Sequence, residues 1–317
     1  MSKSAKIFID GAAGTTGLEI RDRLAGRDEL SLIALSDVER KDQAARKRAL
    51  NEADLVILCL PDEAAREAVA LIDNPATRVI DASTAHRVAE GWDFGFAELE
   101  PDGYSRIAAS KRVSNPGCWS TGFLAIARPL VRAGLVPAEF PLTANGVSGY
   151  SGGGKSMIAE FEDRNSAGYT ETVSRIYGLA LTHKHIPEMQ KHSGLFHPPL
   201  FEPSVGRFYR GMLVEVPLQL WALPGKPTPR DIHAALMKAY PDRPLVKVAS
   251  LEDAGAAKTL DAEIFAGANG LTLYVFANEK AEQARVVAAF DNLGKGASGA
   301  AVQNMNIMLN LPETTGL

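Results

Sequence analysis

The fold is decided near the start of the chain, by Lys6-Ile7-Phe8-Ile9-Asp10 and the following Gly11-Ala12-Ala13-Gly14-Thr15-Thr16-Gly17. The first five residues predict a short buried strand, and the glycines predict a tight turn into a helix that continues through Leu24. Glycine lets the backbone approach a pyrophosphate closely, and a helix N-terminus offers partial positive charge. The spacing is GxxGxxG rather than GxGxxG, so a turn without a ligand stays open as the alternative. We expect dinucleotide contacts from Gly11, Gly14, Thr15, Thr16 and Gly17.

Strand-like and helix-like segments then alternate along the first part of the chain. We expect strands at residues 30–35, 54–60 and 78–81, with helices at residues 41–50 and 62–72. The second of these strands is almost continuously apolar, as in a parallel strand buried on both faces, so Cys59 within it is predicted to be structural. This alternation predicts an α/β fold with a Rossmann-type, doubly wound parallel sheet.

The residues that follow the expected strand at residues 30–35 bear on the choice of dinucleotide. An acidic residue there usually holds the ribose hydroxyls of NAD, whereas a hydroxyl with nearby cations can hold the 2′-phosphate of NADP. Asp37 fits the first pattern, and Ser36, Arg40 and Lys41 fit the second. We favour NADP(H), with a solvated helix start as the alternative role for the two cations.

A polar cluster, Asp81-Ala82-Ser83-Thr84-Ala85-His86-Arg87, ends the strand at residues 78–81. Ligands of such sheets bind at the carboxyl ends of the strands. We therefore expect Ser83 and Thr84 on the nicotinamide side of the cofactor. Arg87 can hold an anionic group of the substrate by a forked contact, and an exposed loop with one arginine is the equal alternative.

Cys118 is the candidate nucleophile. It lies in Ser114-Asn115-Pro116-Gly117-Cys118-Trp119, directly after a Pro-Gly turn and before an apolar, helix-like run at residues 120–130. Unpaired backbone N–H groups and the positive end of a helix dipole favour the thiolate, which is the nucleophilic form. The alternative is a small residue buried at a helix start.

A glycine-rich segment follows in the middle of the chain. Gly149 to Ser156 match the GxxxxGKS phosphate loop of nucleotide triphosphatases. However, the preceding segment at residues 140–147 contains Pro, Thr, Asn and Gly, which suits an edge or antiparallel strand rather than the buried strand of a true phosphate loop. We favour a glycine-rich loop near the active site and keep a phosphoryl transferase as the alternative from a different class of enzyme.

Two histidines and a glutamate form the next cluster, in Leu181-Thr182-His183-Lys184-His185-Ile186-Pro187-Glu188. His183 and His185 face the same side if this segment is extended, and Glu188 can reach back toward His185 if Pro187 opens a helix. One histidine can then be the acid–base partner of Cys118, oriented by Glu188. Polar surface residues and a zinc site are the alternatives, but the spacing lacks the helical HExxH form, and we expect no metal.

Long strands dominate the rest of the chain. Strands at residues 212–220, 271–276 and 284–290, with a helix at residues 228–240, predict an α+β domain with a mixed, largely antiparallel sheet. Arg207 and Arg210 precede the first strand and are candidate anion anchors, with a solvated turn as the equal alternative.

A turn-rich break at residues 294–299 precedes a final helix at residues 300–309, which we expect to return to the first domain. The predicted organisation is a dinucleotide-binding domain at residues 1–117, completed by residues 298–317, and a catalytic and oligomerisation domain at residues 118–297.

The composition excludes several classes of protein. The 317 residues, 46% of them apolar and 23% charged, fit a soluble globular protein of two domains. A net charge of −4 gives no electrostatic case for binding nucleic acid or a membrane surface. Two distant cysteines fit a reducing cytoplasm, and the start, Met1-Ser2-Lys3-Ser4, has no signal-peptide pattern.

Together these motifs resemble one enzyme family, the N-acetyl-gamma-glutamyl-phosphate reductases in their shorter form. The resemblance covers nearly the whole chain, at residues 11–17, 81–87, 114–118, 148–155, 183–188 and 295–306. Its most specific part is Asn115-Pro116-Gly117-Cys118, because aspartate-semialdehyde dehydrogenase, a relative with the same architecture, has an asparagine next to the cysteine instead.

The resemblance implies the reduction of N-acetyl-gamma-glutamyl phosphate, a small-molecule acyl phosphate, to N-acetylglutamate semialdehyde through a Cys118 thioester. It also implies NADP(H) as cofactor, a histidine as acid–base residue, and a homodimer or homotetramer. We favour His185 in that role, and Asp37 is the feature that does not fit NADP(H). The remaining expected contacts are Gly296 with the cofactor and, with the substrate, Arg87, Asn115, His183, Arg207 and Arg210. Two competing hypotheses stay open, namely an aspartyl phosphate substrate and a non-catalytic NADP-binding regulator.

Overall fold

The computed structural model describes residues 4–317, so the expectation about a signal peptide partly concerns residues outside this range. The chain divides into two compact units. Unit 1 comprises Met1–Ala97, Asp102–Pro116 and Ala297–Leu317, and unit 2 comprises Glu98–Pro101 and Gly117–Gly296.

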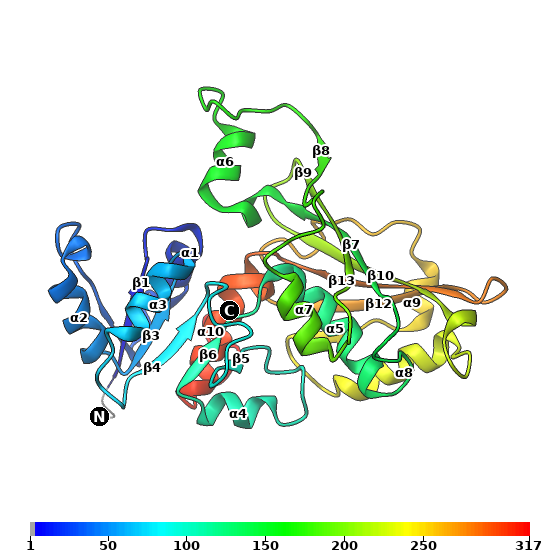
Figure 1. The fold of residues 1–317 in the computed structure, drawn as a ribbon, viewed down its shortest axis with the longest axis horizontal. Helices are drawn as coiled ribbons and strands as arrows, with labels where there is room; N and C mark the ends of the chain where they lie inside the picture. Colours follow the sequence, from blue (N-terminus) through cyan, green and yellow to red (C-terminus); the bar gives the residue numbers. More distant parts are fainter. Residues whose placement is uncertain (1–3) are drawn as a thin grey trace. The chain divides into compact units, whose positions relative to one another are not determined.

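Unit 1 is built on a parallel sheet with the strand order β2-β1-β3-β4-β6-β5 (Figure 1). The strands are β1 (Ala5–Asp10), β2 (Leu30–Ile33), β3 (Leu55–Leu58), β4 (Arg78–Asp81), β5 (Asp93–Phe94) and β6 (Arg112–Ser114). The order reverses between β1 and β3, and ligands of doubly wound sheets bind at the carboxyl ends of the strands where this happens. The predicted glycine-rich turn follows β1 and therefore lies at this switch point.

Both faces of the sheet are buried, because side chains alternate along β1 between two apolar clusters. Ile7 and Ile9 belong to one cluster and Phe8 to the other. The first cluster includes residues of α1 (Thr15–Leu24), α4 (Gly103–Ala109) and α10 (Gly299–Met308). The second includes residues of α2 (Gln43–Glu52) and α3 (Asp62–Ala70). The final helix α10 is buried along its whole length within unit 1.

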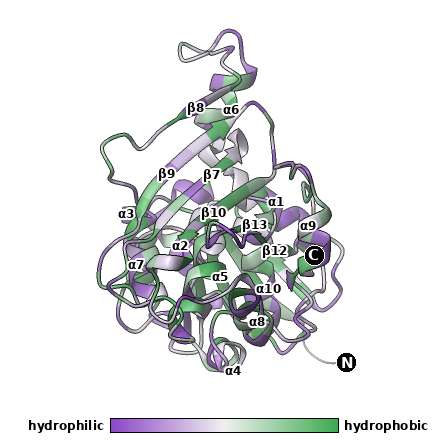
Figure 2. Cartoon of the chain, turned by 90° about the vertical axis from the view of Figure 1, so that its right-hand side faces the viewer, coloured by the Kyte–Doolittle hydropathy of each residue, from purple (hydrophilic) through white to green (hydrophobic). Residues whose placement is uncertain are grey.

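Unit 2 contains a seven-stranded sheet with the order β11-β12-β13-β10-β7-β9-β8. Its pairs are antiparallel except for β11 with β12 and β7 with β9, which confirms the predicted mixed, largely antiparallel sheet. The strands are β7 (Thr143–Gly149), β8 (Ser174–Ile176), β9 (Leu200–Gly206), β10 (Met212–Gln219), β11 (Val246–Val248), β12 (Leu271–Asn278) and β13 (Gln283–Phe290). In Figure 2, which colours the chain by hydropathy, β10 is largely apolar.

Five α-helices belong to this second unit: α5 (Cys118–Arg132), α6 (Gly154–Glu162), α7 (Ile186–Ser193), α8 (Pro229–Ala239) and α9 (Leu251–Ala256). Helix α5 packs closely on the sheet, since a Cβ atom added to Gly122 would lie 2.6 Å from Val214 of β10. Helix α8 begins with a capping box, in which Thr228 and Asp231 bond reciprocally.

Two local predictions were wrong. The strand expected at residues 140–147 begins only at Thr143, beyond Pro141. It is antiparallel to β10, which confirms one of the two expected forms, but it also pairs with β9 in parallel and so does not lie at an edge. The break expected at residues 294–299 is a π-helical turn, Gly294–Ser298, whose residues are mostly buried. Pro141 misled the first prediction, because it precedes the strand instead of lying within it.

Among residues 4–317, no helix combines the length and the apolar character that crossing a bilayer requires.

Candidate active site

The turn between β1 and α1 leaves no room for a side chain at Gly11 or at Gly17. Gly11 has a φ of +90°, and a Cβ atom there would lie 2.2 Å from the carbonyl oxygen of Cys59. A Cβ atom on Gly17 would lie 2.5 Å from the carbonyl oxygen of Gly11. Gly14 is the N-cap of α1 and provides no side-chain cap for the helix. A bare backbone turn at a helix start, located at the switch point of the sheet, fits a dinucleotide pyrophosphate.

The residues predicted to select the dinucleotide are engaged by acidic neighbours. The backbone N–H and the hydroxyl of Ser36 donate to Glu39 Oε2 at 2.9 and 2.7 Å, and these bonds lower the pKa of the Glu39 carboxyl. Arg40 forms an ion pair with Asp37. Lys41 is exposed. A 2′-phosphate would therefore compete with two carboxylates for the donors of this turn.

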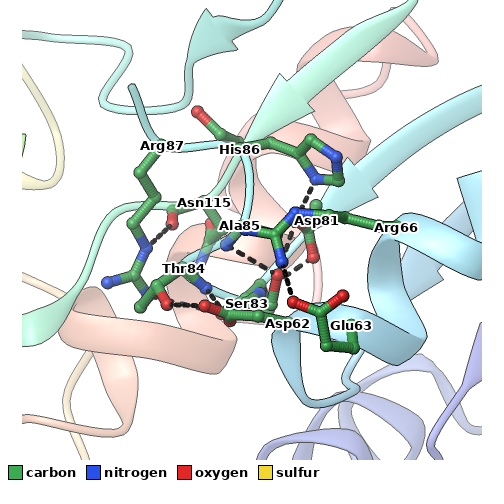
Figure 3. A network of polar contacts seen from close by, with 12 residues as sticks. Asp62, Glu63, Arg66, Asp81, Ser83, Thr84, Ala85, His86, Arg87 and Asn115 are labelled. Atoms are coloured by element: carbon green, nitrogen blue, oxygen red, sulfur yellow. Dashed lines mark hydrogen bonds and ion pairs between the residues drawn. The ribbon is translucent and has the colours of Figure 1, made fainter. Parts of the chain in front are cut away.

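A network of polar contacts organises the loop after β4 (Figure 3). The buried carboxylate of Asp81 accepts hydrogen bonds from the Ser83 backbone and hydroxyl, and its Oδ2 lies 2.6 Å from His86 Nδ1. Asp62, in the first turn of α3, accepts hydrogen bonds from the Thr84 backbone and hydroxyl. Ser83 and Thr84, the two predicted nicotinamide contacts, thus donate their hydroxyl protons to carboxylates of unit 1, and these bonds shape the loop.

Arg87 ends this loop and is itself held in place. Its Nε donates to the carbonyl oxygen of Asn115 at 3.1 Å, and its Nη2 lies 3.3 Å from the carbonyl oxygen of Ala82 (Figure 3). The Asn115 side-chain amide donates to the carbonyl oxygen of Ala297 at 2.9 Å, and its Oδ1 accepts from the Asn304 amide at 3.1 Å. Because both ends of this amide have partners within unit 1, we withdraw Asn115 as a substrate contact and assign it a structural role.

Cys118 is the first residue of α5, as predicted. Gly117 is the N-cap, and no side-chain cap bonds to this helix start. The carbonyl oxygen of Gly117 accepts from the backbone and hydroxyl of Thr121. Its N–H donates to the carboxylate of Glu188 at 3.1 Å, so this donor is unavailable to a developing oxyanion. Cys118 thus lies in the first turn of a helix without a side-chain cap, a position at which the helix dipole favours a thiolate.

His185 is the N-cap residue of α7 and is buried. Its Nε2 lies 4.0 Å from Oε1 of Glu188, the glutamate that also accepts from Gly117. The rings of His183 and His185 are 4.8 Å apart, and the His185 N–H donates to His183 Nδ1 at 3.3 Å. The short-range spacing predicted these contacts, and Glu188 joins the imidazole to the cysteine turn.

Trp119, which follows Cys118, packs with two aromatic residues that the sequence did not single out. Trp119 donates from its indole nitrogen to the Tyr177 hydroxyl at 2.8 Å and packs edge-on against Phe201. Burial, and then the charge of Cys118, raise the pKa of Tyr177, which keeps it neutral. Tyr177 and Phe201 also line a pocket of about 560 Å³ in unit 2. No motif marks Tyr177 or Phe201, because their partner Trp119 is far away in sequence.

The backbone of Gly296 packs against Cys118. A Cβ atom on Gly296 would lie 2.8 Å from Cys118 Cβ and 3.3 Å from the Phe290 ring. The sequence predicted Gly296 only as a cofactor contact, and its packing against Cys118 was missed.

The two arginines before β10 have internal partners. Arg207 donates to the carbonyl oxygens of Thr172, Phe161 and Thr170, and its guanidinium lies 5.3 Å from the Phe161 ring centre. Arg210 pairs with the buried carboxylate of Asp291 at 2.8 Å. Neither was expected to be used in this way, and we withdraw both as primary anion anchors.

The glycine-rich segment does not present a phosphate cradle. The N–H groups of Gly149, Tyr150 and Ser151 donate to carbonyl oxygens of residues 208–211. A phosphate loop needs such N–H groups to face the ligand. The geometry therefore argues against the phosphoryl-transferase alternative.

Two further observations bear on the chemistry. Within the described range 4–317, no group of three or more His, Cys, Asp or Glu residues is placed to hold a metal ion. Burial, with the nearby carboxylates Asp81 and Asp10, raises the pKa of the Cys59 thiol to about 12, so this thiol is neutral near pH 7. Cys59 thus behaves as the structural cysteine that the sequence predicted.

Comparison with known proteins identifies the family. The semialdehyde dehydrogenase NAD binding domain matches residues 6–107, and the semialdehyde dehydrogenase dimerisation domain matches residues 118–292. A protein of Trichormus variabilis named N-acetyl-gamma-glutamyl-phosphate reductase is 51% identical, over 98% of this chain and 99% of its own length. A protein of the same name from Brucella ovis is 52% identical, over 96% of this chain and 98% of its own.

Solved structures show the same fold at much lower identity. Aspartate semialdehyde dehydrogenase II of Vibrio cholerae, complexed with ASA, has a TM-score of 0.71 at 15% identity and covers 98% of this chain and 99% of its own. Aspartate semialdehyde dehydrogenase with NADP from Candida albicans has a TM-score of 0.65 at 13% identity, over 96% and 99%. With two matching domain models and half of its residues shared with full-length relatives, the chain belongs to the semialdehyde dehydrogenase family, in the branch of the N-acetyl-gamma-glutamyl-phosphate reductases.

Proposed function

We propose that this chain catalyses the NADPH-dependent reduction of N-acetyl-gamma-glutamyl phosphate to N-acetylglutamate semialdehyde, with release of phosphate. The observation that carries the proposal is the cysteine at the start of α5, joined through Glu188 to the buried imidazole of His185. The names of the two full-length relatives at about half identity support the substrate.

In the first half of the reaction, Cys118 is the nucleophile. Its thiolate, favoured by the N-terminus of α5, attacks the carbonyl carbon of the acyl phosphate. A C–S bond forms, the bond to the phosphate oxygen breaks, and phosphate leaves with the bonding electrons. The product is a thioester, which divides one difficult step into two easier ones.

In the second half, the protein handles a proton and a leaving thiolate. NADPH, when bound, supplies the hydride that reduces the thioester carbonyl. His185 donates a proton to the developing oxyanion and takes it back as the C–S bond breaks, which releases the semialdehyde and restores the Cys118 thiolate. Glu188, 4.0 Å from the imidazole, orients His185 for both transfers.

Unit 1 is proposed to hold the cofactor. Gly11, Gly14 and Gly17, with Thr15 and Thr16 at the start of α1, would face the pyrophosphate, because this glycine-rich turn leads into a helix N-terminus that has no side-chain cap. Ser36, Arg40 and Lys41 would hold the 2′-phosphate, which would displace Glu39 from Ser36 and Asp37 from Arg40. Ser83 and Thr84 would shape the nicotinamide side through their bonds to Asp81 and Asp62.

Arg87 is the proposed anion anchor for the substrate, with His183 as a second contact. Two backbone carbonyl oxygens hold the Arg87 guanidinium, so its orientation is set before the substrate arrives. A preorganised guanidinium loses little side-chain entropy on binding a carboxylate or phosphate.

The remaining proposals concern assembly and location. A homodimer or homotetramer is supported by the dimerisation domain that matches residues 118–292. Two free cysteines support a reducing cytoplasm.

The test is phosphate-dependent reduction of NADP with N-acetylglutamate semialdehyde, and with aspartate semialdehyde as the competing substrate. We expect turnover with the first and at least about a hundredfold lower kcat/KM with the second, because the acetyl amide must find hydrogen-bond partners. Cys118→Ser should abolish turnover and leave NADPH binding intact. Near-normal turnover by that variant would exclude the thioester.

A further inference from the structure

The position of the Cys118 side chain is limited by a residue far away in sequence. A Cβ atom on Gly296 would lie 2.8 Å from Cys118 Cβ, closer than real Cβ contacts come. The same atom would meet the backbone oxygen of Asp291 at 3.2 Å, so it has no free direction in which to move. The bare backbone of Gly296 therefore forms the surface on which the cysteine rests.

Gly296 belongs to the π-helical turn Gly294–Ser298. Single π turns are rare and are concentrated at functional sites. Asp291 fixes the start of this turn, since its Oδ1 accepts from the N–H groups of Leu293 and Gly294 at 2.8 and 3.0 Å. The Gly296 N–H donates to the Asp291 carbonyl oxygen at 3.1 Å. The turn is thus held at its start and at Gly296.

The side chain next to Gly296 adds a third attachment. Lys295 Nζ donates to both carboxylate oxygens of Glu98, at 2.7 and 2.8 Å. The two side chains are 2% and 0% exposed. A buried ion pair is costly to desolvate and adds little stability compared with apolar residues of similar size, so a role in fixing geometry is the better explanation for this one.

We infer that the Lys295–Glu98 pair and the π-helical turn are a positioning device for the Cys118 sulfur, and that Gly296 is required there for close packing against the nucleophile. Lys295, Glu98 and Gly296 are accordingly positioning residues, and this role replaces the predicted cofactor contact of Gly296. The inference rests on the proposed function only in taking Cys118 as the nucleophile.

The test is Gly296→Ala, compared with Gly255→Ala as the matched control. Gly255 lies in α9 with open space around its Cα, so its substitution should change nothing. The readouts are the pH profile of Cys118 alkylation by iodoacetamide, followed by peptide mass spectrometry, and NADPH binding by fluorescence titration. We expect Gly296→Ala to slow alkylation about tenfold and kcat about a hundredfold, because displacements below an ångström are costly at a reacting atom. NADPH affinity should stay within twofold of the parent protein.

A second variant keeps the inference testable if Gly296→Ala fails to fold. Lys295→Met combined with Glu98→Gln removes both charges together and leaves no buried ion without a partner. We expect this double variant to show the same slow alkylation and unchanged NADPH affinity.

Two results would overturn the inference. One is weakened NADPH binding with normal alkylation in Gly296→Ala, which would restore the cofactor contact. The other is parental alkylation in the double variant, which would leave the ion pair without a positioning role. Normal turnover by Cys118→Ser would refute the proposed function instead, and slow alkylation in Gly296→Ala would still show that the turn positions the sulfur.

Discussion

Glu188 accepts a hydrogen bond from the Gly117 N–H and also lies beside His185, and two substitutions separate these roles. Its Oε2 accepts the Gly117 N–H at 3.1 Å, and its Oε1 lies 4.0 Å from His185 Nε2, while the side chain is 1% exposed. Glu188→Gln keeps an acceptor for Gly117 but loses the charge beside His185. Glu188→Ala loses both and leaves a buried N–H without its partner.

The expected magnitudes follow from these contacts. An unsatisfied buried N–H costs about 1–3 kcal/mol, so Glu188→Ala should lower the free energy of unfolding by that amount. Glu188→Gln should lower it by less than about 1 kcal/mol, because a neutral acceptor remains. Both variants should lose about 10–100-fold in kcat, since an imidazole without its orienting carboxylate transfers protons less effectively.

Urea unfolding followed by circular dichroism measures the first quantity, and steady-state NADPH oxidation measures the second. Equal stability of the two variants would show that the bond to Gly117 contributes nothing. A parental kcat for Glu188→Gln would refute the orienting role and direct attention to His183.

Other predictions address packing, pH and the cofactor. Gly122→Ala should lower the free energy of unfolding by about 1–2 kcal/mol in urea titrations, because the new methyl group would meet Val214 at 2.6 Å. The neutral Cys59 thiol has a pKa raised from 9.0 to about 12, so its stabilising contribution is complete below pH 9 and is lost as the pH rises toward 12. The stability difference between the parent and Cys59→Ala should therefore shrink by about 1 kcal/mol between pH 9 and 10, where the unfolded thiol goes from half to almost fully ionised; a constant difference would contradict this. Glu39→Gln should bind NADPH about threefold more tightly in fluorescence titrations, with NADH affinity unchanged, because Ser36 is released from a competing carboxylate; equal gains for both cofactors would contradict this.

The elements that the sequence predicted well are those set by neighbouring residues. The strand, glycine turn and helix at residues 5–24 depend on local periodicity and on the positive φ of Gly11, which favours glycine. The contact between His185 and Glu188 follows from a spacing of three residues at a helix start. Cys118 at the start of α5 follows from the Pro-Gly turn before it.

The predicted contacts that the structure does not favour involve residues whose partners are distant in sequence. Arg207 resembles an anion anchor by its type and place, but carbonyl oxygens 35 to 46 residues earlier in the chain take its donors. Asn115 is occupied by the Asn304 amide, 189 residues away. No periodicity or spacing encodes such pairs, because they arise only when separate elements pack together. For the same reason, the sequence did not predict the role of Tyr177 or the contact between Gly296 and Cys118.

The burial of α10 in unit 1 has a consequence for biosynthesis. Val302 and Met305 complete the apolar cluster that also contains Ile7, Ile20 and Ile80. The unit whose strands are translated first therefore cannot close its interior until residues 299–308 have emerged from the ribosome. Until then, an unfinished apolar surface stays open to chaperones, and a truncation that removes α10 would leave the nucleotide-binding unit permanently exposed to them.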